Sequence, residues 1–321
     1  MKSLAVALLL VLACAGGVAR GAPAKGDGPT TIAAGYGAVW VGTGTGTVIR
    51  IDARTRRITH RLLGGDTRAP SFVHDLAVGF GSVWIARGRY DTLTRLDPRT
   101  NRTVDIRPRG SCCWTATLVE VGAGAVWVGD YDRNTVFRVD PRTNRVVAAA
   151  RVPGRLVNVV AGPAGVWVAT ARGMRLTPAM PQEIRRLDPA TNRIGAVVFR
   201  SECHLTLAVG SQRLWVSDLC GKTVTAIGDR VGPSAEVDDA SVGLAVGEGA
   251  VWAQSQLGYL TRLDARSGRR AVLVRVRGSW LAVGAGGVWV LDQGDGTVGF
   301  VRKVDSRTNR VVGEPIRIEP R

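Results

Sequence analysis

The sequence is poor in the residues and motifs that many enzymes use. It has only three histidines among 321 residues. No G-x-S-x-G stands in a strand–turn–helix context, and the G-x-G repeats are turn glycines with no helix to follow. No phosphate-binding loop is present, and no segment after the N-terminal apolar run is long enough to span a bilayer. The sequence therefore gives no strong sign of catalysis.

Lysine is also scarce, so the net charge of +17 is carried almost entirely by arginine. A large field of one sign favours anionic partners. The chain has no recognisable nucleic-acid motif, and its N-terminus indicates export, so nucleic acid is not an expected partner. Anionic envelope polymers or phospholipid head groups fit better. The lysines are Lys2, Lys25, Lys222 and Lys303.

Residues 119–152 contain the unit from which the rest of the chain is copied. Four short runs rich in β-branched and aromatic residues are separated by Gly, Asp, Asn or Pro, which is typical of strands and turns. The runs predict strands at 119–122, 126–128, 136–139 and 146–152. Residues 140–144 (Asp-Pro-Arg-Thr-Asn) predict a tight turn.

Seven copies of a G-x-x-x-[VL]-W-[VIA] block run along the chain, and a turn similar to residues 140–144 follows six of them. Only the fifth unit, at residues 227–230, has lost this turn. A period near 40 with four strands per unit predicts a β-propeller, here all-β and seven-bladed, with an open solenoid as the weaker alternative. The block tryptophans, expected to pack between blades, are Trp40, Trp84, Trp127, Trp167, Trp215, Trp252 and Trp289.

A basic residue recurs two positions before the turn aspartate. This regularity favours a structural role, as an ion pair or a cross-strand pair, over a role in binding anions. The residues are Arg50, Arg95, Arg138, Arg186, Arg262 and Lys303.

The repeat, quoted as LAVGAGAVWV…VFRVDPRTNRVVAAARVPG, resembles the YVTN-type (YncE-like) repeat of bacterial extracytoplasmic β-propellers. The streptogramin lyases share similar units. The resemblance covers about residues 30–318 and implies the fold, while propellers host many unrelated functions. The likeness to streptogramin lyases implies a divalent metal at one mouth of the ring, with His74, Asp75, Glu202 and His204 as candidate ligands. The closely spaced His/Glu pattern of those lyases is absent, so the expectation is no metal and no cofactor.

The N-terminus predicts export. Residues 1–13 hold one lysine and then an apolar run too short to span a membrane, so residues 1–24 are interpreted as a signal peptide. Residues 11–14 resemble a lipobox that would lipidate Cys14. The alternative is ordinary cleavage near Ala22 or Ala24. A leader over 25–31 and one propeller domain over 32–318 complete the expected organisation.

Four cysteines remain after removal of the signal peptide, an even number that suggests two disulfides in an oxidising compartment. Cys203 and Cys220 both fall in unit five on the face of the inter-blade connections, so we pair them. Cys112 and Cys113 then either form a vicinal disulfide or remain as thiols.

The residues that break the repeat gather on that same face, around the channel mouth. Departures from a repeat are where a site is built, so we expect the ligand to bind there. The candidate ligand-binding residues are His74, Asp75, Trp114, Tyr131, Asn158, His204 and Trp280.

The resulting hypothesis is an exported, non-catalytic and monomeric propeller that binds a small molecule, an envelope polymer or a protein. It would contact a membrane only through a lipid anchor. The alternative is a metal-dependent lyase or hydrolase of streptogramin-lyase type.

Overall fold

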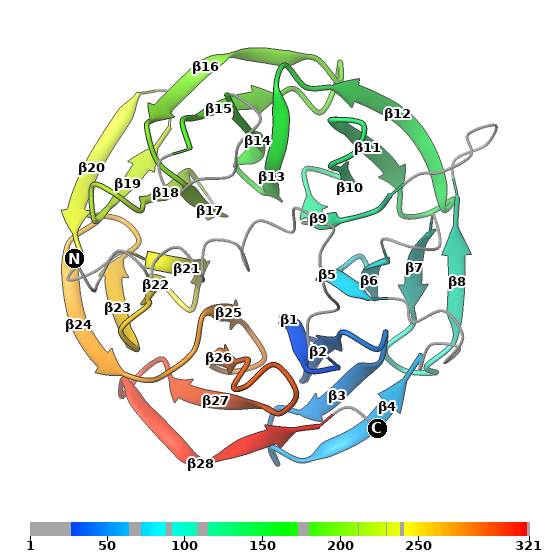
Figure 1. The fold of residues 1–321 in the computed structure, drawn as a ribbon, viewed down its shortest axis with the longest axis vertical. Coiled ribbons are helices and arrows are strands. Elements are labelled where there is room, and N and C mark those ends of the chain that lie inside the picture. The colour runs from blue at the N-terminus through cyan, green and yellow to red at the C-terminus, as the bar shows by residue number, and fades with distance from the viewer. Residues whose placement is uncertain are drawn as a thin grey trace.

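Seven four-stranded antiparallel sheets follow one another around a ring in the part of the chain that the structure describes (Figure 1). The structure is a computed structural model that describes residues 27–63, 72–87, 92–107, 115–172, 180–210, 212–228, 230–237 and 241–319. We number the sheets blade 1 to blade 7 in chain order. The predicted seven-bladed β-propeller is confirmed.

The first three blades occupy the N-terminal half of the ring. Blade 1 consists of β1 (Pro29–Gly35), β2 (Ala38–Thr43), β3 (Val48–Asp52) and β4 (Ile58–Leu62). Blade 2 consists of β5 (Val73–Gly79), β6 (Ser82–Arg87), β7 (Thr92–Leu96) and β8 (Thr103–Ile106). Blade 3 consists of β9 (Leu118–Gly122), β10 (Ala125–Asp130), β11 (Thr135–Asp140) and β12 (Arg145–Arg151).

The remaining four blades continue in the same direction. Blade 4 consists of β13 (Arg155–Gly162), β14 (Gly165–Ala171), β15 (Gln182–Leu187) and β16 (Ile194–Ser201). Blade 5 consists of β17 (Leu205–Val209), β18 (Leu214–Asp218), β19 (Thr223–Ile227) and β20 (Val231–Glu236). Blade 6 consists of β21 (Ser241–Gly247), β22 (Ala250–Ser255), β23 (Tyr259–Asp264) and β24 (Arg270–Arg275). Blade 7 consists of β25 (Trp280–Val283), β26 (Val288–Asp292), β27 (Gly299–Asp305) and β28 (Arg310–Ile318).

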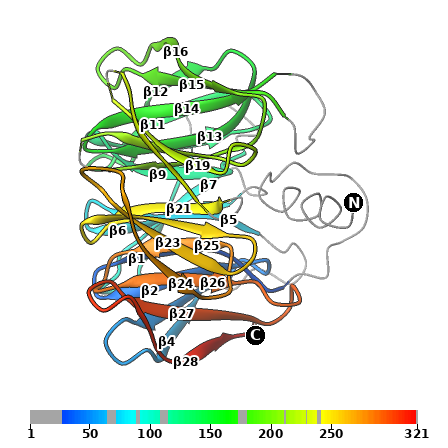
Figure 2. The same cartoon turned by 90° about the vertical axis from the view of Figure 1, so that its left-hand side faces the viewer.

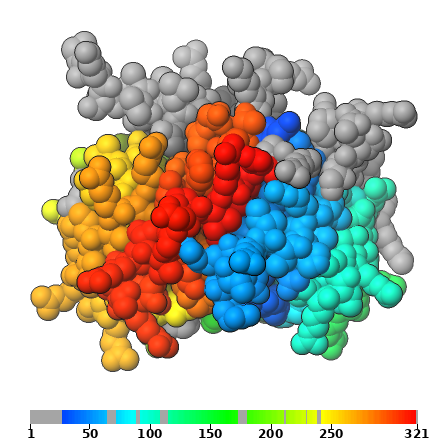
Figure 3. Space-filling view, turned by 90° about the horizontal axis from the view of Figure 1, so that it is seen from below, coloured from blue at the N-terminus to red at the C-terminus, as the bar shows by residue number. Residues whose placement is uncertain are grey.

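Each blade is built from one contiguous segment, with its first strand next to the central channel and its fourth strand on the rim (Figure 1). Neighbouring blades pack face to face without exchanging a strand (Figure 2). Blade 7 therefore meets blade 1 only through contacts across their junction (Figure 3). Gly28 donates its backbone N–H to Gly296 O, and Arg61 donates to Glu319 O. No helix in the described residues is long and apolar enough to cross a membrane.

The block tryptophans are buried between neighbouring blades, as predicted. Each packs in an apolar cluster with side chains of the following blade; Trp127, for example, lies with Leu156 and Val159 of blade 4. Five of the seven indole N–H groups donate to the carbonyl of the glycine that opens the block, at 3.0 to 3.4 Å. Trp167 packs between blades 4 and 5, and Trp215 packs between blades 5 and 6. Neither indole makes such a bond to a described residue.

The recurring basic residue forms a cross-strand pair with the tryptophan. In six blades the cation lies over the indole ring, 5.0 to 6.0 Å from a ring centroid. The strand register places the two residues opposite one another, as for Trp84 and Arg95. The structural interpretation of these arginines is therefore correct in its cross-strand form, with an aromatic ring as the partner in place of a carboxylate.

In four of these six blades the same cation also bonds to the turn of the next blade; the cations are Arg95, Arg138, Arg262 and Lys303. Arg95 Nη1 donates to Pro141 O at 2.7 Å and to Asn144 Oδ1 at 2.8 Å, both in the turn of blade 3. Equivalent bonds join Arg138 to Pro189 O and Lys303 to Ala53 O. We call this arrangement, a cation on its own tryptophan and bonded to the next turn, the inter-blade latch.

The turn that receives the latch is shaped by its own side chains. In blade 3, Asp140 accepts hydrogen bonds from the Arg142 N–H and the Thr143 hydroxyl, and Asn144 has a φ of 58°. Asparagine tolerates this left-handed conformation, which explains its recurrence at the end of the turn.

Blade 5 departs from this plan in two ways. Its turn occupies only residues 228–230, between the paired Ile227 and Val231, whereas the blade 3 turn occupies 140–145 between Val139 and Val146. Blade 5 also contains the disulfide between Cys203 and Cys220, with their Cα atoms 5.9 Å apart. The predicted pairing of these two cysteines is present. Cys14, Cys112 and Cys113 lie outside the described residues.

Candidate functional site: the channel and its mouth

The first strands of all seven blades enclose a central cavity of about 260 Å³. Its lining is aliphatic, with small residues such as Ala33, Ala77 and Ala245 at the same position of successive strands. Glu120, on β9, is the one polar side chain among the described residues of this lining.

Glu120 replaces the small aliphatic residue that the other blades carry two positions before the strand-ending glycine. The equivalent residue is alanine in five blades and Val160 in blade 4. Glu120 pairs across the sheet with Trp127. Glu120 is not among the candidate residues predicted from the sequence, although its position in the repeat, two residues before the glycine, distinguishes it from the other six blades.

Asp75, on the neighbouring strand β5, lies beside Glu120. Asp75 Oδ2 accepts a hydrogen bond from the backbone N–H of Val119 at 3.0 Å, and Oδ1 accepts from Leu76 N at 2.9 Å. Burial raises the pKa of Asp75 to about 6, although these N–H groups and the Thr31 hydroxyl act in the opposite direction. The Asp75 carboxylate thereby ties blade 2 to blade 3, and its predicted contact with a ligand stays a prediction.

Burial also raises the pKa of Glu120 well above its usual range, and the nearby charge of Asp75 adds to this effect. Two acids close to one another disfavour double ionisation. The pair therefore keeps a proton at pH values where exposed carboxylates have lost theirs. Since Asp75 is engaged by backbone donors, Glu120 is the group able to donate a hydrogen bond to a ligand, or to bind a cation after losing its proton.

The mouth of the channel is the end at which the first strands of the blades begin. His74 lies there, at a bulge between Val73 and Asp75 in β5. Its ring is 4.8 Å from the Phe72 ring, centroid to centroid. Burial lowers the pKa of His74 to about 4 against the opposing charge of Asp132, so the imidazole is neutral at pH 7.

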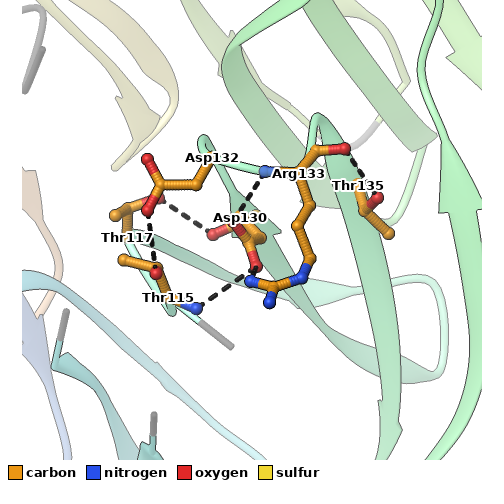
Figure 4. A network of polar contacts seen from close by, with 7 residues as sticks. Thr115, Thr117, Asp130, Asp132, Arg133 and Thr135 are labelled. Atoms are coloured by element: carbon orange, nitrogen blue, oxygen red, sulfur yellow. Dashed lines mark hydrogen bonds and ion pairs between the residues drawn. The ribbon is translucent and has the colours of Figure 1, made fainter. Parts of the chain in front are cut away.

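A polar network on blade 3 holds the segment around Thr115 (Figure 4). The network includes Asp132, whose charge acts on His74. The fully buried Asp130 accepts from Thr115 N at 3.2 Å and pairs with Arg133 at 3.2 Å. The Thr115 hydroxyl donates to Asp132 Oδ2 at 3.0 Å. This network fixes the chain at Thr115, the residue after Trp114. Trp114 itself lies outside the described residues.

His204 lies just before β17, at the blade 5 side of the channel mouth. The Gln182 side chain accepts from Leu205 N with its oxygen, so its amide nitrogen donates to His204 Nδ1 at 3.0 Å. This arrangement leaves the His204 proton on Nε2. Burial lowers the pKa of His204 to about 4, so this imidazole too is neutral at pH 7.

The other predicted contacts differ in their environments. Tyr131 donates its hydroxyl to Val157 O at 3.0 Å, which joins blade 3 to blade 4. Trp280, half-buried at the start of β25, packs against the apolar cluster between blades 7 and 1. Asn158, half-buried in β13, makes no side-chain hydrogen bond to a described residue that would occupy its amide.

The candidate metal ligands His74, Glu202 and His204 do not come together. Among the described residues, no group of three or more His, Cys, Asp or Glu side chains could hold a metal ion. His74 belongs to blade 2, and His204 precedes the first strand of blade 5.

Comparison with known proteins supports the fold alone. No family model matches the sequence, and no curated protein matches it. A solved structure of Kuenenia stuttgartiensis hydrazine synthase superposes with a TM-score of 0.63 at 13% identity, over 95% of this chain and 100% of that one. The crystal structure of the computationally designed protein Ika8 gives a TM-score of 0.61 at 13% identity, over 90% of this chain and 87% of that one.

Proposed function

We propose that the protein is an exported binding propeller whose ligand enters the central channel through the mouth. The observation that carries the proposal is Glu120, a single protonatable group in an otherwise aliphatic lining. Ligand sites commonly combine apolar walls with a few placed polar groups. The ligand is therefore a mainly apolar molecule, or an apolar segment of a larger one, with one hydrogen-bonding or cationic group.

The mouth suits an entry site. Both imidazoles are neutral at pH 7, and Trp280 is half-buried beside an apolar cluster. Neutral rings can cover an apolar ligand without the cost of desolvating a charge. A non-catalytic role fits the scarcity of groups arranged for chemistry.

Thermal stabilisation by small compounds tests the proposal, because a ligand that binds only the folded state raises the melting temperature. Suitable probes are aliphatic and aromatic compounds that end in an amine, an alcohol or a carboxylate. We expect stabilisation that is reduced in Glu120→Ala, which restores the residue of five other blades, and in Ala208→Phe, which narrows the channel. Arg142→Ala, in an exposed turn at the opposite end of the blades, is the control. Equal stabilisation of all four proteins would disprove channel binding.

Export and membership of the YVTN-type repeat family are part of the same proposal. The Cys203–Cys220 disulfide supports an oxidising compartment, where such bonds persist. Cell fractionation with N-terminal sequencing should find a mature chain that lacks residues 1–24, or one that begins at a lipidated Cys14. Palmitate labelling that depends on Cys14 separates these two forms, and full-length chain in the cytoplasm would exclude both.

Metal analysis of the purified mature protein checks the alternative that the protein is a metal-dependent lyase or hydrolase.

A further inference from the structure

A second cavity lies between blades 4 and 5, away from the channel, on the face where the turns project. Its volume is about 580 Å³, within the range of small-molecule sites. It occupies the place where blade 5 has lost the long turn that the other blades carry. Six residues matter for its chemistry: Trp167, Arg186, Gln212, Arg213, Gly228 and Arg230.

Arg186 occupies the latch position of blade 4, but the turn that it should contact is shortened in blade 5. It lies over Trp167, with its guanidinium carbon 6.0 Å from a ring centroid, as in the other blades. No described residue accepts a hydrogen bond from its guanidinium group. Arg186 is exposed, whereas Arg50, Arg95, Arg138, Arg262 and Lys303 are all half-buried.

The intact latches show what a partner of Arg186 should offer. Arg95 Nε donates to Ser82 Oγ of its own blade at 2.8 Å, and its Nη1 donates to two oxygen atoms of the next turn, Pro141 O and Asn144 Oδ1, at 2.7 and 2.8 Å. A carboxylate or a phosphate presents two oxygens with similar spacing to a guanidinium fork, and it adds an opposite charge. The place beside the Arg186 guanidinium, where the turn oxygens lie in the intact latches, therefore suits an oxyanion.

The charge around the cavity points the same way. Arg213 and Arg230 line it with Arg186, and no described lining residue is acidic. Asp188 is an acidic neighbour of Arg186, but its carboxylate already accepts from Ala190 N and the Thr191 hydroxyl, at 2.8 Å each. Asp229 lies outside the described residues.

We propose that this cavity binds a small organic anion through its carboxylate or phosphate groups, with Arg186 as the central contact. Arg213 and Arg230 supply further positive charge, and Trp167 provides an apolar surface beneath Arg186. This site is separate from the channel and does not depend on the function proposed for it. It also gives the excess of arginine a local role that the sequence-based interpretation did not assign.

Calorimetric titration of the full mature chain tests the proposal. The probes are citrate and pyrophosphate, which distinguish recognition of carboxylate from recognition of phosphate. The ionic strength is about 0.15 M, which screens weak attraction between the probes and surface charges. We expect saturable binding of at least one probe. Arg186→Ala should weaken it by about tenfold or more, the effect of losing a charged hydrogen bond. Arg142→Ala removes the same charge from an exposed turn and should leave the affinity within about twofold of that of the wild type.

A turn graft provides the second test. Residues 228–230 are replaced by the sequence of residues 140–145, Asp-Pro-Arg-Thr-Asn-Arg, which offers Arg186 the oxygens that the other latches use. We expect the graft to abolish binding and raise the melting temperature, even though it increases the net charge by one. Absence of saturable binding, equal weakening by Arg142→Ala, or undiminished binding by the graft would each overturn the proposal.

Discussion

Tryptophan side chains between blades are the largest buried groups in this protein. Trp127 is 1% exposed and packs against blade 4. We expect Trp127→Ala to lower the free energy of unfolding by roughly 3–5 kcal/mol, the usual cost of truncating a buried aromatic residue. Chemical denaturation measures this loss. Val147→Ala, at a position 54% exposed on the rim, is the control and should change stability by less than about 0.5 kcal/mol. A near-neutral result at Trp127 would contradict the packing described for it.

Glu120 makes stability depend on pH in an unusual direction. Its pKa is raised in the folded state, so the folded protein binds a proton more tightly than the unfolded chain does. The contribution of Glu120 to the free energy of unfolding therefore falls as pH rises above the usual glutamate range. Glu120→Gln cannot ionise, so we expect its stability relative to the wild type to increase from pH 5 to pH 9.

The comparison with Glu120→Gln is needed because other groups titrate nearby. His74 and His204 have lowered pKa values of about 4, so their contribution rises with pH up to about 6.5. Their effect cancels when variant and wild type are compared at each pH. A constant difference across the range would show that Glu120 is already ionised in the folded protein.

At the scale of the element, the latch joins neighbouring blades by bonds that the strands themselves do not make. Arg95→Met keeps an apolar chain over Trp84 but loses the bonds to Pro141 and Asn144 of the next blade, together with the bond to Ser82 in its own blade. We expect a loss of about 1.5–3 kcal/mol in urea unfolding, typical of a hydrogen bond to a charged group. Arg186→Met removes the same charge where no latch is closed, and it should cost no more than about 1 kcal/mol. Equal losses at both positions would mean that the bond to the next turn does not stabilise the ring.

Blade 5 lacks a latch on both sides, and its disulfide compensates locally. The bridge joins positions 17 residues apart. Closing a loop of this length contributes about 3 kcal/mol by restricting the unfolded chain. We expect the Cys203→Ala, Cys220→Ala double variant to lose about this amount under oxidising conditions, and a reducing agent to bring the wild type to the same stability. A wild type that is unaffected by reduction would contradict this role.

The strands and turns could be predicted because each repeat carries its own local signals. The predicted strands of residues 119–152 agree with β9 to β12 to within two residues at each end. Most of the strands begin or end beyond the apolar residues, whereas β12 ends one residue before the predicted end at 152. The site was harder to predict. Tyr131 is aromatic and near the mouth, but its hydroxyl is used within the protein. The arginine cavity depends on how a short turn in one blade meets Arg186 in another, which no single repeat encodes.

At the scale of the whole molecule, the ring is held closed without a shared strand. Because every blade is contiguous, the chain can be opened between Arg107 and Thr115 and rejoined by a short linker between its present ends. The connection between blades 3 and 4 uses only residues 152–154, which shows that a short link can reach from rim to channel. We expect this circular permutant to fold with an unchanged circular dichroism spectrum and cooperative unfolding. Failure of this permutant to fold would show that closure depends on the native chain order.

The junction of blades 7 and 1, which share no strand, also affects how the molecule would respond to mechanical load. β28 is the last strand of the described residues and an outer strand, paired on one side only, with β27. A force that pulls the C-terminus away from the rim loads its ladder bonds one after another, like a zip, because antiparallel bonds lie perpendicular to the strand. This propeller should therefore yield at low force and from its C-terminal edge, blade by blade.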